Sequence, residues 1–134
     1  MHYISLFESL TGAVTKDCII DEKLNRLIFV VKPGDMGLAI GKGGSNVKRL
    51  KRMIGKNVEV VEYSDDPEEF IKHSLSPARV RLIKISTVPD GRKMAYVTIE
   101  PQDKGIAIGR EGKNISRARI IAKRYFDIDH VVIV

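Results

Sequence analysis

Two short glycine-containing segments carry the residues whose types and spacing could bind an anion. They are Gly41-Lys42-Gly43-Gly44 and Gly109-Arg110-Glu111-Gly112, and a basic stretch with helical periodicity follows each. Glycine permits positive φ and lets another group approach the backbone closely. The amides and the positive dipole at the start of a helix favour phosphate oxygens. Lys42 and Arg110 add a cation at matching positions, so each segment is predicted to bind phosphate.

The two segments belong to an internal repeat with an offset of 68 residues. A stretch of 16 residues around the first segment aligns without gaps to the stretch around the second, and eight positions are identical. The repeat pairs Ile40 with Ile108 before the loops and Asn46 with Asn114 after them. A tight turn between helices is the alternative for a single Gly-X-X-Gly segment. Two copies that share the Ile, the Asn and a cation-rich helix favour phosphate binding.

The basic residues are concentrated around these segments. Residues 36–58 carry a net charge of +6 and residues 104–126 also carry +6, although the whole chain carries only +6. The rest of the chain is therefore acidic. Solvated surfaces usually mix the two signs, so this segregation indicates a polyanionic partner. The cations nearest the loops are the predicted phosphate ligands: Lys42, Lys48, Arg110, Lys113 and Arg117.

The periodicity of each half predicts the same order of elements twice. The first half is expected to form a helix near residues 4–12, strands at 17–21 and 25–32, helices at 35–40 and 45–53, and a strand at 58–62. The second half is expected to form a helix with an acidic start near residue 66, strands at 79–87 and 93–100, helices at 102–108 and 113–126, and a strand at 130–134. The predicted class is α+β, with two αββααβ domains at residues 1–62 and 63–134, each a three-stranded sheet packed by helices.

The composition of the chain excludes several classes of protein. With 43% hydrophobic and 30% charged residues and no long apolar run, the 134 residues resemble a soluble globular protein with no membrane contact. The N-terminus does not resemble a secretion signal, so a cytoplasmic location is expected. Cys18 is the single cysteine and is predicted to lie in the core, and the three His residues lack ligand spacing. Neither a metal nor a cofactor is expected.

Catalysis is also disfavoured. A nucleotide-binding P-loop needs Gly-X4-Gly-Lys-Ser/Thr, but only three residues separate Gly37 from Gly41, and Gly43 follows Lys42. The Gly-X-Gly-X-X-Gly fingerprint fails because Asn46 stands where its third glycine belongs. No nucleophile and base occur at a recognisable spacing, so the chain is predicted not to be an enzyme.

The low aromatic content indicates which side chains would contact the bases of a nucleic acid. With four Tyr, four Phe and no Trp, a platform of aromatic side chains for stacking bases is not expected. The aliphatic residues Ile40 and Ile108 are predicted to contact bases instead.

The repeated Ile-Gly-X-X-Gly segment within an αββααβ unit resembles the type II KH domain, in which this loop clamps about four nucleotides of a single strand. The resemblance covers nearly the whole chain. A second segment, Val58 to Ile71 followed by Leu75-Ser76-Pro77-Ala78-Arg79-Val80, is similar to the junction between the tandem KH domains of the NusA family of transcription factors. Bacterial members carry further domains, so the chain is similar to the shorter, archaeal form.

The resemblance implies a single-stranded RNA-binding protein that acts in transcription termination or elongation. The partners would be the nascent transcript and an RNA polymerase complex, and the protein is expected to be a monomer. A KH-type protein of ribosome assembly or structure is the alternative. Glu111 places an acid inside the second loop and is expected to weaken its grip on phosphate. The predicted RNA-binding residues are Ile40, Gly41, Lys42, Gly43, Gly44, Asn46 and Lys48, and Ile108, Gly109, Arg110, Glu111, Gly112, Lys113, Asn114 and Arg117.

Overall fold

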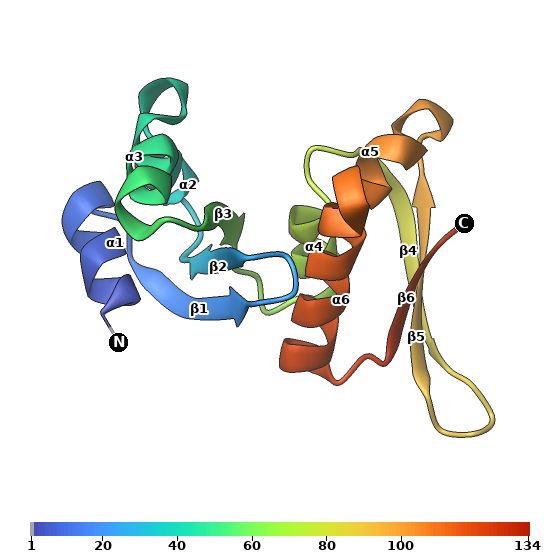
Figure 1. Cartoon of the computed structure of the whole chain (residues 1–134). Coiled ribbons are helices and arrows are strands. Elements are labelled where there is room, and N and C mark those ends of the chain that lie inside the picture. The colour runs from blue at the N-terminus through green and yellow to red at the C-terminus, as the bar shows by residue number, and fades with distance from the viewer. Residues whose placement is uncertain (1) are drawn as a thin grey trace. The chain divides into compact units, whose positions relative to one another are not determined.

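A computed structural model describes residues 2–134 of the chain, and Figure 1 shows the order of its elements. The chain divides into two compact units, Met1–Ser64 and Asp65–Val134. This division falls two residues after the boundary that the sequence predicts between residues 62 and 63. Each unit has the predicted αββααβ order.

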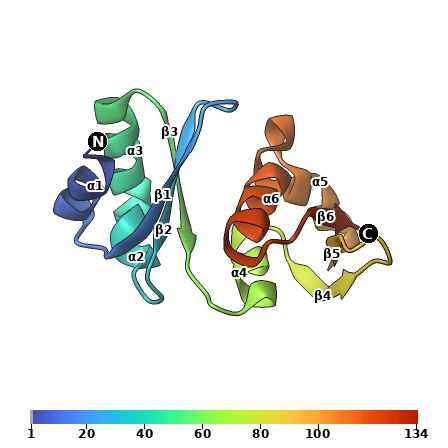
Figure 2. The same ribbon diagram turned by 90° about the horizontal axis from the view of Figure 1, so that it is seen from below.

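The first unit is a three-stranded sheet with its helices on one face, as Figure 2 shows. Strand β1 pairs antiparallel with β2, and β2 pairs parallel with β3. A parallel neighbour needs a crossover connection, and the two helices that carry the first glycine loop between them form it. The elements are α1 (Tyr3–Thr11), β1 (Thr15–Asp21), β2 (Arg26–Val31), α2 (Met36–Ile40), the 3₁₀ turn η1 (Lys42–Gly44), α3 (Ser45–Ile54) and β3 (Asn57–Glu62).

The core of the first unit follows from the alternation of side chains along β2. Leu27, Phe29 and Val31 share one face of the strand and are fully buried against the helices. The ring of Phe7 from α1 stacks on the ring of Phe29 with a centroid distance of 4.2 Å. Leu50 supplies the buried position of α3. The helix that follows the glycine loop is therefore held on the sheet by its apolar stripe, and its charged residues are left outside.

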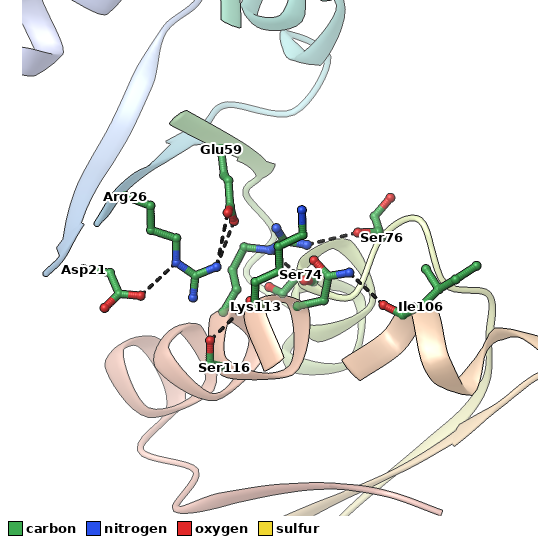
Figure 3. A network of polar contacts seen from close by, with 10 residues as sticks. Asp21, Arg26, Glu59, Ser74, Ser76, Ile106, Lys113 and Ser116 are labelled. Atoms are coloured by element: carbon green, nitrogen blue, oxygen red, sulfur yellow. Dashed lines mark hydrogen bonds and ion pairs between the residues drawn. The ribbon is translucent and has the colours of Figure 1, made fainter. Parts of the chain in front are cut away.

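One cation of the first unit is buried and paired with two carboxylates. Arg26, at the start of the central strand, is 1% exposed. Its guanidinium donates to Asp21 Oδ2 at 2.8 Å and to Glu59 Oε1 at 3.0 Å (Figure 3). The two acceptors belong to β1 and β3, so Arg26 connects all three strands of the sheet. A buried arginine needs such partners because an unpaired buried charge is strongly destabilising.

The second unit repeats this architecture. Strand β4 pairs antiparallel with β5, β5 pairs parallel with β6, and the helices again cover one face (Figure 2). Its core gathers Leu75, Val97, Ala118 and Val131 from a helix end, a central strand, the long helix and an edge strand. The elements are α4 (Pro67–Ser74), β4 (Val80–Thr87), β5 (Lys93–Ile99), η2 (Pro101–Asp103), α5 (Lys104–Ile108), η3 (Arg110–Gly112), α6 (Lys113–Phe126) and β6 (His130–Ile133).

Local sequence signals explain where these elements begin. The acidic start predicted for α4 is confirmed, because the Asp66 side chain accepts the N–H of Glu69 at 3.2 Å and Pro67 occupies the first turn.

Two expectations differ in detail. A 3₁₀ turn at Pro101–Asp103 precedes α5, where one helix was expected from residue 102. Cys18 packs at the edge of the core and is only partly buried. Among residues 2–134, no helix has the length and apolar character needed to cross a membrane.

Candidate functional site

Each predicted phosphate loop joins a short helix to a longer one with the same backbone geometry in both units. In the first unit, Gly41 has φ 75° and ψ 169°, and Gly43 has φ 62° and ψ 22°. In the second unit, Gly109 has φ 78° and ψ 169°, and Glu111 has φ 58° and ψ 22°. The two loops therefore differ in their side chains and not in the path of the chain.

No side chain fits at the first glycine of either loop. The φ and ψ of Gly41 belong to a region that essentially only glycine adopts. A Cβ at this position would also lie 2.8 Å from Asn46 Cγ, and a Cβ at Gly109 would lie 3.0 Å from Asn114 Nδ2. Both the torsion angles and the neighbouring asparagine thus require glycine here.

The two predicted asparagines lie beside the loops, but their amides are directed into the protein. Asn46 Nδ2 donates to the Leu38 carbonyl oxygen at 2.8 Å. Asn114 Nδ2 donates to the Ile106 carbonyl oxygen at 2.7 Å, and Asn114 is only 5% exposed. Each asparagine therefore connects the start of the long helix to the short helix before the loop.

Part of the amide cradle predicted from sequence is used inside the loop itself. The N–H of Gly44 donates to the Gly41 carbonyl oxygen at 3.1 Å, and the N–H of Ser45 donates to the Lys42 carbonyl oxygen. The two matching amides of the second loop are donated in the same way. Because these amides already have acceptors, the predicted binding of phosphate at the loops would depend more on the side-chain cations.

Four of the five predicted phosphate ligands lie in the loops or directly beside them. Lys42 and Arg110 are exposed within the loops. Lys48 of α3 is exposed, and its side chain lies over the loop, because a Cβ on Gly44 would be 3.9 Å from Lys48 Cε. Lys113 is exposed at the first position of α6. The structure thus gives each loop a pair of cations.

The fifth predicted ligand, Arg117, has different surroundings. It is 7% exposed, and its Nε donates to the Ser74 carbonyl oxygen at 2.8 Å. Its Nη2 donates to the Ser76 carbonyl oxygen at 3.0 Å, and both acceptors are labelled in Figure 3. Carbonyls at a helix C-terminus favour a cation, so Arg117 secures the end of α4 to α6. The burial of Arg117 and its two acceptors favour a structural role over the predicted binding of phosphate.

Exposed aliphatic side chains adjoin each loop. Ile40 is 37% exposed and Ile108 is 47% exposed. Leu38 and Ile106, two residues earlier in the same short helices, are exposed by 52% and 44%. The alanine between each pair is fully buried, so the short helices contact the core through a methyl group and leave two large apolar side chains in solvent. Leu38 and Ile106 were not predicted as site residues, although their matching positions in the repeat were a signal that could have found them.

Two aspartates that position the short helices were not predicted either. Asp35 is 8% exposed, and its Oδ2 accepts the N–H of Val14 at 2.8 Å. Asp103 is 6% exposed, and its Oδ2 accepts the N–H of Arg79 at 2.9 Å. Val14 and Arg79 directly precede β1 and β4, so each aspartate holds the start of its short helix against the first strand of its unit.

The aspartate of the second unit also forms an ion pair. Arg79 Nε donates to Asp103 Oδ2 at 2.9 Å, and Arg79 Nη2 donates to Asp103 Oδ1 at 3.2 Å. These hydrogen bonds lower the pKa of the Asp103 carboxyl and raise the pKa of Arg79 relative to their ordinary values. The carboxylate is therefore charged while it holds the backbone N–H at the start of β4.

Comparison with known proteins identifies the class of both units. A model of the KH domain matches residues 2–88, and a model of the NusA-like second KH domain matches residues 67–132. The two αββααβ units are tandem KH domains.

Relatives of known name cover the whole length of the chain. It is 39% identical over 131 residues to the probable transcription termination protein NusA of Halococcus morrhuae, which covers 98% of this chain and 91% of that protein. It is 41% identical over 128 residues to the protein of the same name from Halobacterium salinarum, which covers 96% of this chain and 89% of that protein. The crystal structure of APE1850 matches with a TM-score of 0.88 and 42% identity over 99% of this chain and 96% of that one. The chain therefore belongs to the NusA family, in its archaeal form.

The Arg79–Asp103 contact generates a prediction for stability. We expect Asp103→Asn to destabilise the protein near neutral pH, because the amide loses the ion pair and one acceptor for the Arg79 donors. The lowered pKa means that the charged carboxylate stabilises the fold at pH values above its ordinary pKa of about 3.9. That contribution is lost as the pH falls through the folded-state value. Urea unfolding of both proteins across this range should show the stability difference shrinking in acid.

The exposed Asp65→Asn is the matched control, since it removes a carboxylate at the start of the same unit without touching a strand. A difference between wild type and Asp103→Asn that stays constant with pH would contradict the assignment.

Proposed function

We propose that the chain binds single-stranded RNA through both Gly-X-X-Gly loops and acts in transcription termination or elongation. One observation carries the proposal: the same constellation occurs twice, on the same backbone. Each copy has a loop that requires glycine, an exposed cation in the loop, and two exposed aliphatic side chains on the preceding helix. The cations supply contacts to phosphate and the aliphatic side chains supply contacts to base faces.

The aliphatic side chains favour a single strand over a duplex. Bases in a helix are stacked and paired, whereas those of a single strand can turn toward an apolar surface. Contacts to phosphate alone would suit either form. The proposed RNA contacts comprise Ile40, Gly41, Lys42, Gly43, Gly44 and Lys48 in the first domain, and Ile108, Gly109, Arg110, Glu111, Gly112 and Lys113 in the second. Leu38 and Ile106 extend the apolar surface of each site.

The transcriptional part of the proposal rests on the named relatives. Those from Halococcus and Halobacterium are called probable transcription termination proteins. By this analogy the RNA is the nascent transcript, the protein partner is an RNA polymerase complex, and the chain works in the cytoplasm as a monomer that binds and does not catalyse. The side chains of the site, which are cations, aliphatic groups and the carboxylate of Glu111, support binding of RNA.

The two loops are proposed to bind RNA unequally. Gly43 and Glu111 have almost the same φ and ψ, so the difference between them is the Glu111 side chain. An exposed carboxylate inside the loop repels the phosphate that Arg110 attracts. The first loop should therefore contribute more to RNA affinity than the second.

The ranking predicts the outcome of charge reversal at each loop. We expect Lys42→Asp/Gly43→Asp to lower affinity for a mixed-sequence single-stranded RNA by about tenfold or more, because the loop releases several phosphates and repulsion is added. Arg110→Asp/Glu111→Asp should cost less. Asp tolerates the left-handed backbone at position 43, so the fold should be kept. Fluorescence anisotropy over a range of salt concentrations measures both the affinity and its salt dependence, whose slope should fall by about 0.7 for each phosphate that the variant no longer binds.

A matched control separates the loop from general charge. Lys23→Asp/Asn25→Asp changes the charge by the same amount, and Asn25 also has positive φ (50°), but the pair lies in the turn between β1 and β2. Its affinity should stay close to wild type. Glu111→Gly should raise affinity by removing the repulsion. Equal losses at the two loops, or no effect of Glu111→Gly, would contradict the ranking.

The proposed partner distinguishes transcription from ribosome assembly, the other class of role for a KH protein. We expect the tagged chain, expressed in an archaeal cell, to sediment and co-purify with RNA polymerase. Where the transcript contributes to this association, ribonuclease treatment should weaken it. The measurement is immunoblotting of gradient fractions for polymerase and ribosomal subunits. A chain found only with ribosomal particles would overturn the transcriptional proposal while leaving RNA binding intact.

A further inference from the structure

We infer that Asn46 and Asn114 are positioning residues, which hold the Gly-X-X-Gly loops in the shape that binds RNA and do not themselves contact RNA. The inference rests on the proposed RNA-binding function of the loops and revises the role that the sequence predicts for both asparagines. It follows from how the short helix ends before each loop.

The backbone at the end of α2 leaves the carbonyl of Leu38 without its usual donor. In an α-helix, the carbonyl oxygen of residue 38 would accept the N–H of residue 42. The N–H of Gly41 still donates to the Gly37 carbonyl oxygen at 3.0 Å. At Gly41 the chain then leaves the helix with positive φ, and Asn46 Nδ2 donates to the Leu38 carbonyl oxygen at 2.8 Å. The asparagine thus supplies the hydrogen bond that the turn takes away.

The same substitution of donors occurs in the second domain. The N–H of Gly109 donates to the Gly105 carbonyl oxygen at 2.9 Å, and Asn114 Nδ2 donates to the Ile106 carbonyl oxygen at 2.7 Å. In both copies of the repeat, an asparagine side chain therefore donates to the carbonyl that the turn leaves without a backbone donor. A role shared by both copies is favoured over a contact to a particular nucleotide.

Each asparagine is also packed against the glycine that begins its loop. A Cβ at Gly41 would lie 2.8 Å from Asn46 Cγ and 2.9 Å from Asn46 Nδ2. At Gly109 the corresponding distances to Asn114 are 3.1 Å and 3.0 Å. The amide plane of the asparagine therefore fills the space beside the glycine. It fixes the torsion angles of the loop as well as the end of the helix.

Burial argues against direct contact with RNA in the second domain, whereas Asn46 is half-buried and is assigned by its hydrogen bond and its packing against Gly41. Asn114 is 5% exposed, so its side chain can meet a ligand only if the loop rearranges. A helix of five residues has little stability of its own, because nucleation in isolation is unfavourable. Without the asparagine the short helix and the loop should sample other conformations. A loop that no longer holds the binding shape contacts fewer phosphates, so affinity for RNA falls.

The test compares the loop of the free protein with its affinity for RNA. We expect Asn46→Ala to speed hydrogen exchange at the amides of Gly41 and Gly44 in the absence of RNA. It should also lower affinity for a mixed-sequence single-stranded RNA by about five- to tenfold, the usual effect of losing one intramolecular hydrogen bond. Asn114→Ala should do the same in the second loop.

The salt dependence of binding distinguishes a positioning role from a contact to a base, because losing a contact to a base would not change the salt slope. Because a neutral side chain that positions the loop acts through the phosphate-binding groups of its neighbours, Asn46→Ala should reduce the salt slope by about 0.7 for each phosphate that the loop no longer binds. Coupling to the glycine provides a second readout. The loss of affinity caused by Gly41→Ala should be smaller in the Asn46→Ala background than in wild type, because the steric clash with the amide is gone.

Met53→Ala, at an exposed position near the other end of α3, is the matched control and should leave exchange and affinity unchanged. Thermal melting of every variant checks that the domain stays folded, and the near-isosteric Asn46→Leu, which removes the donor and adds no charge, replaces Asn46→Ala if that variant unfolds. Lower affinity with unchanged loop exchange and salt slope would overturn the inference in favour of direct contact. Wild-type protein that fails to bind RNA would instead overturn the proposed function, while the exchange measurement on free protein would still decide the role of the asparagine.

Discussion

At Gly41 and Gly109 the backbone takes φ of 75° and 78°, and the groups that each domain is proposed to direct at RNA depend on this turn. The torsion angles end the short helix, place the loop cation in solvent and set the direction of the long helix that follows. A Cβ would collide with the neighbouring asparagine, so the geometry can exist only with glycine. The proposed binding of phosphate and the local fold thus depend on the same residue.

This turn makes the short helix before it a weak element that needs support at both ends. The carboxylate of Asp35 fixes its start to the residue before β1, and the amide of Asn46 fixes its end to the long helix. Asp103 and Asn114 repeat this support in the second domain. Between the two attachments, one alanine of each short helix is fully buried in the core, and the large aliphatic side chains on either side of it are exposed. Polar contacts at the ends therefore free the apolar surface for binding.

The repeat in the sequence predicts most of the fold, because hydrophobic period and turn residues report directly on local structure. The αββααβ order, the start of α4 at Asp66 and the apolar stripe around Leu50 all follow from neighbours in the chain. Even the positive φ of Glu111 could be expected from its alignment with Gly43.

The contacts that sequence reasoning missed join residues far apart in the chain. Arg117 has the same charge and helical setting as a phosphate ligand, and only the position of α4 shows that carbonyls 41 and 43 residues earlier accept its hydrogen bonds. The acceptor role of Asp35 depends in the same way on the return of Val14 to the helix start across 21 residues. Spacing along the chain carries no information about such pairs, so a cation or carboxylate in a functional segment can be structural without any local sign.

The central claim is that both loops, which have the same backbone geometry, bind RNA, and that the first loop contributes more to the affinity. Two-dimensional NMR of the intact protein during titration with a short mixed-sequence single-stranded RNA tests it most directly, because every loop amide is observed separately. The account predicts that the largest chemical-shift changes fall on residues 40–44 and 108–112, and that those of the first group saturate at lower RNA concentration. Shift changes that avoid both loops, or a second loop that saturates first, would contradict it.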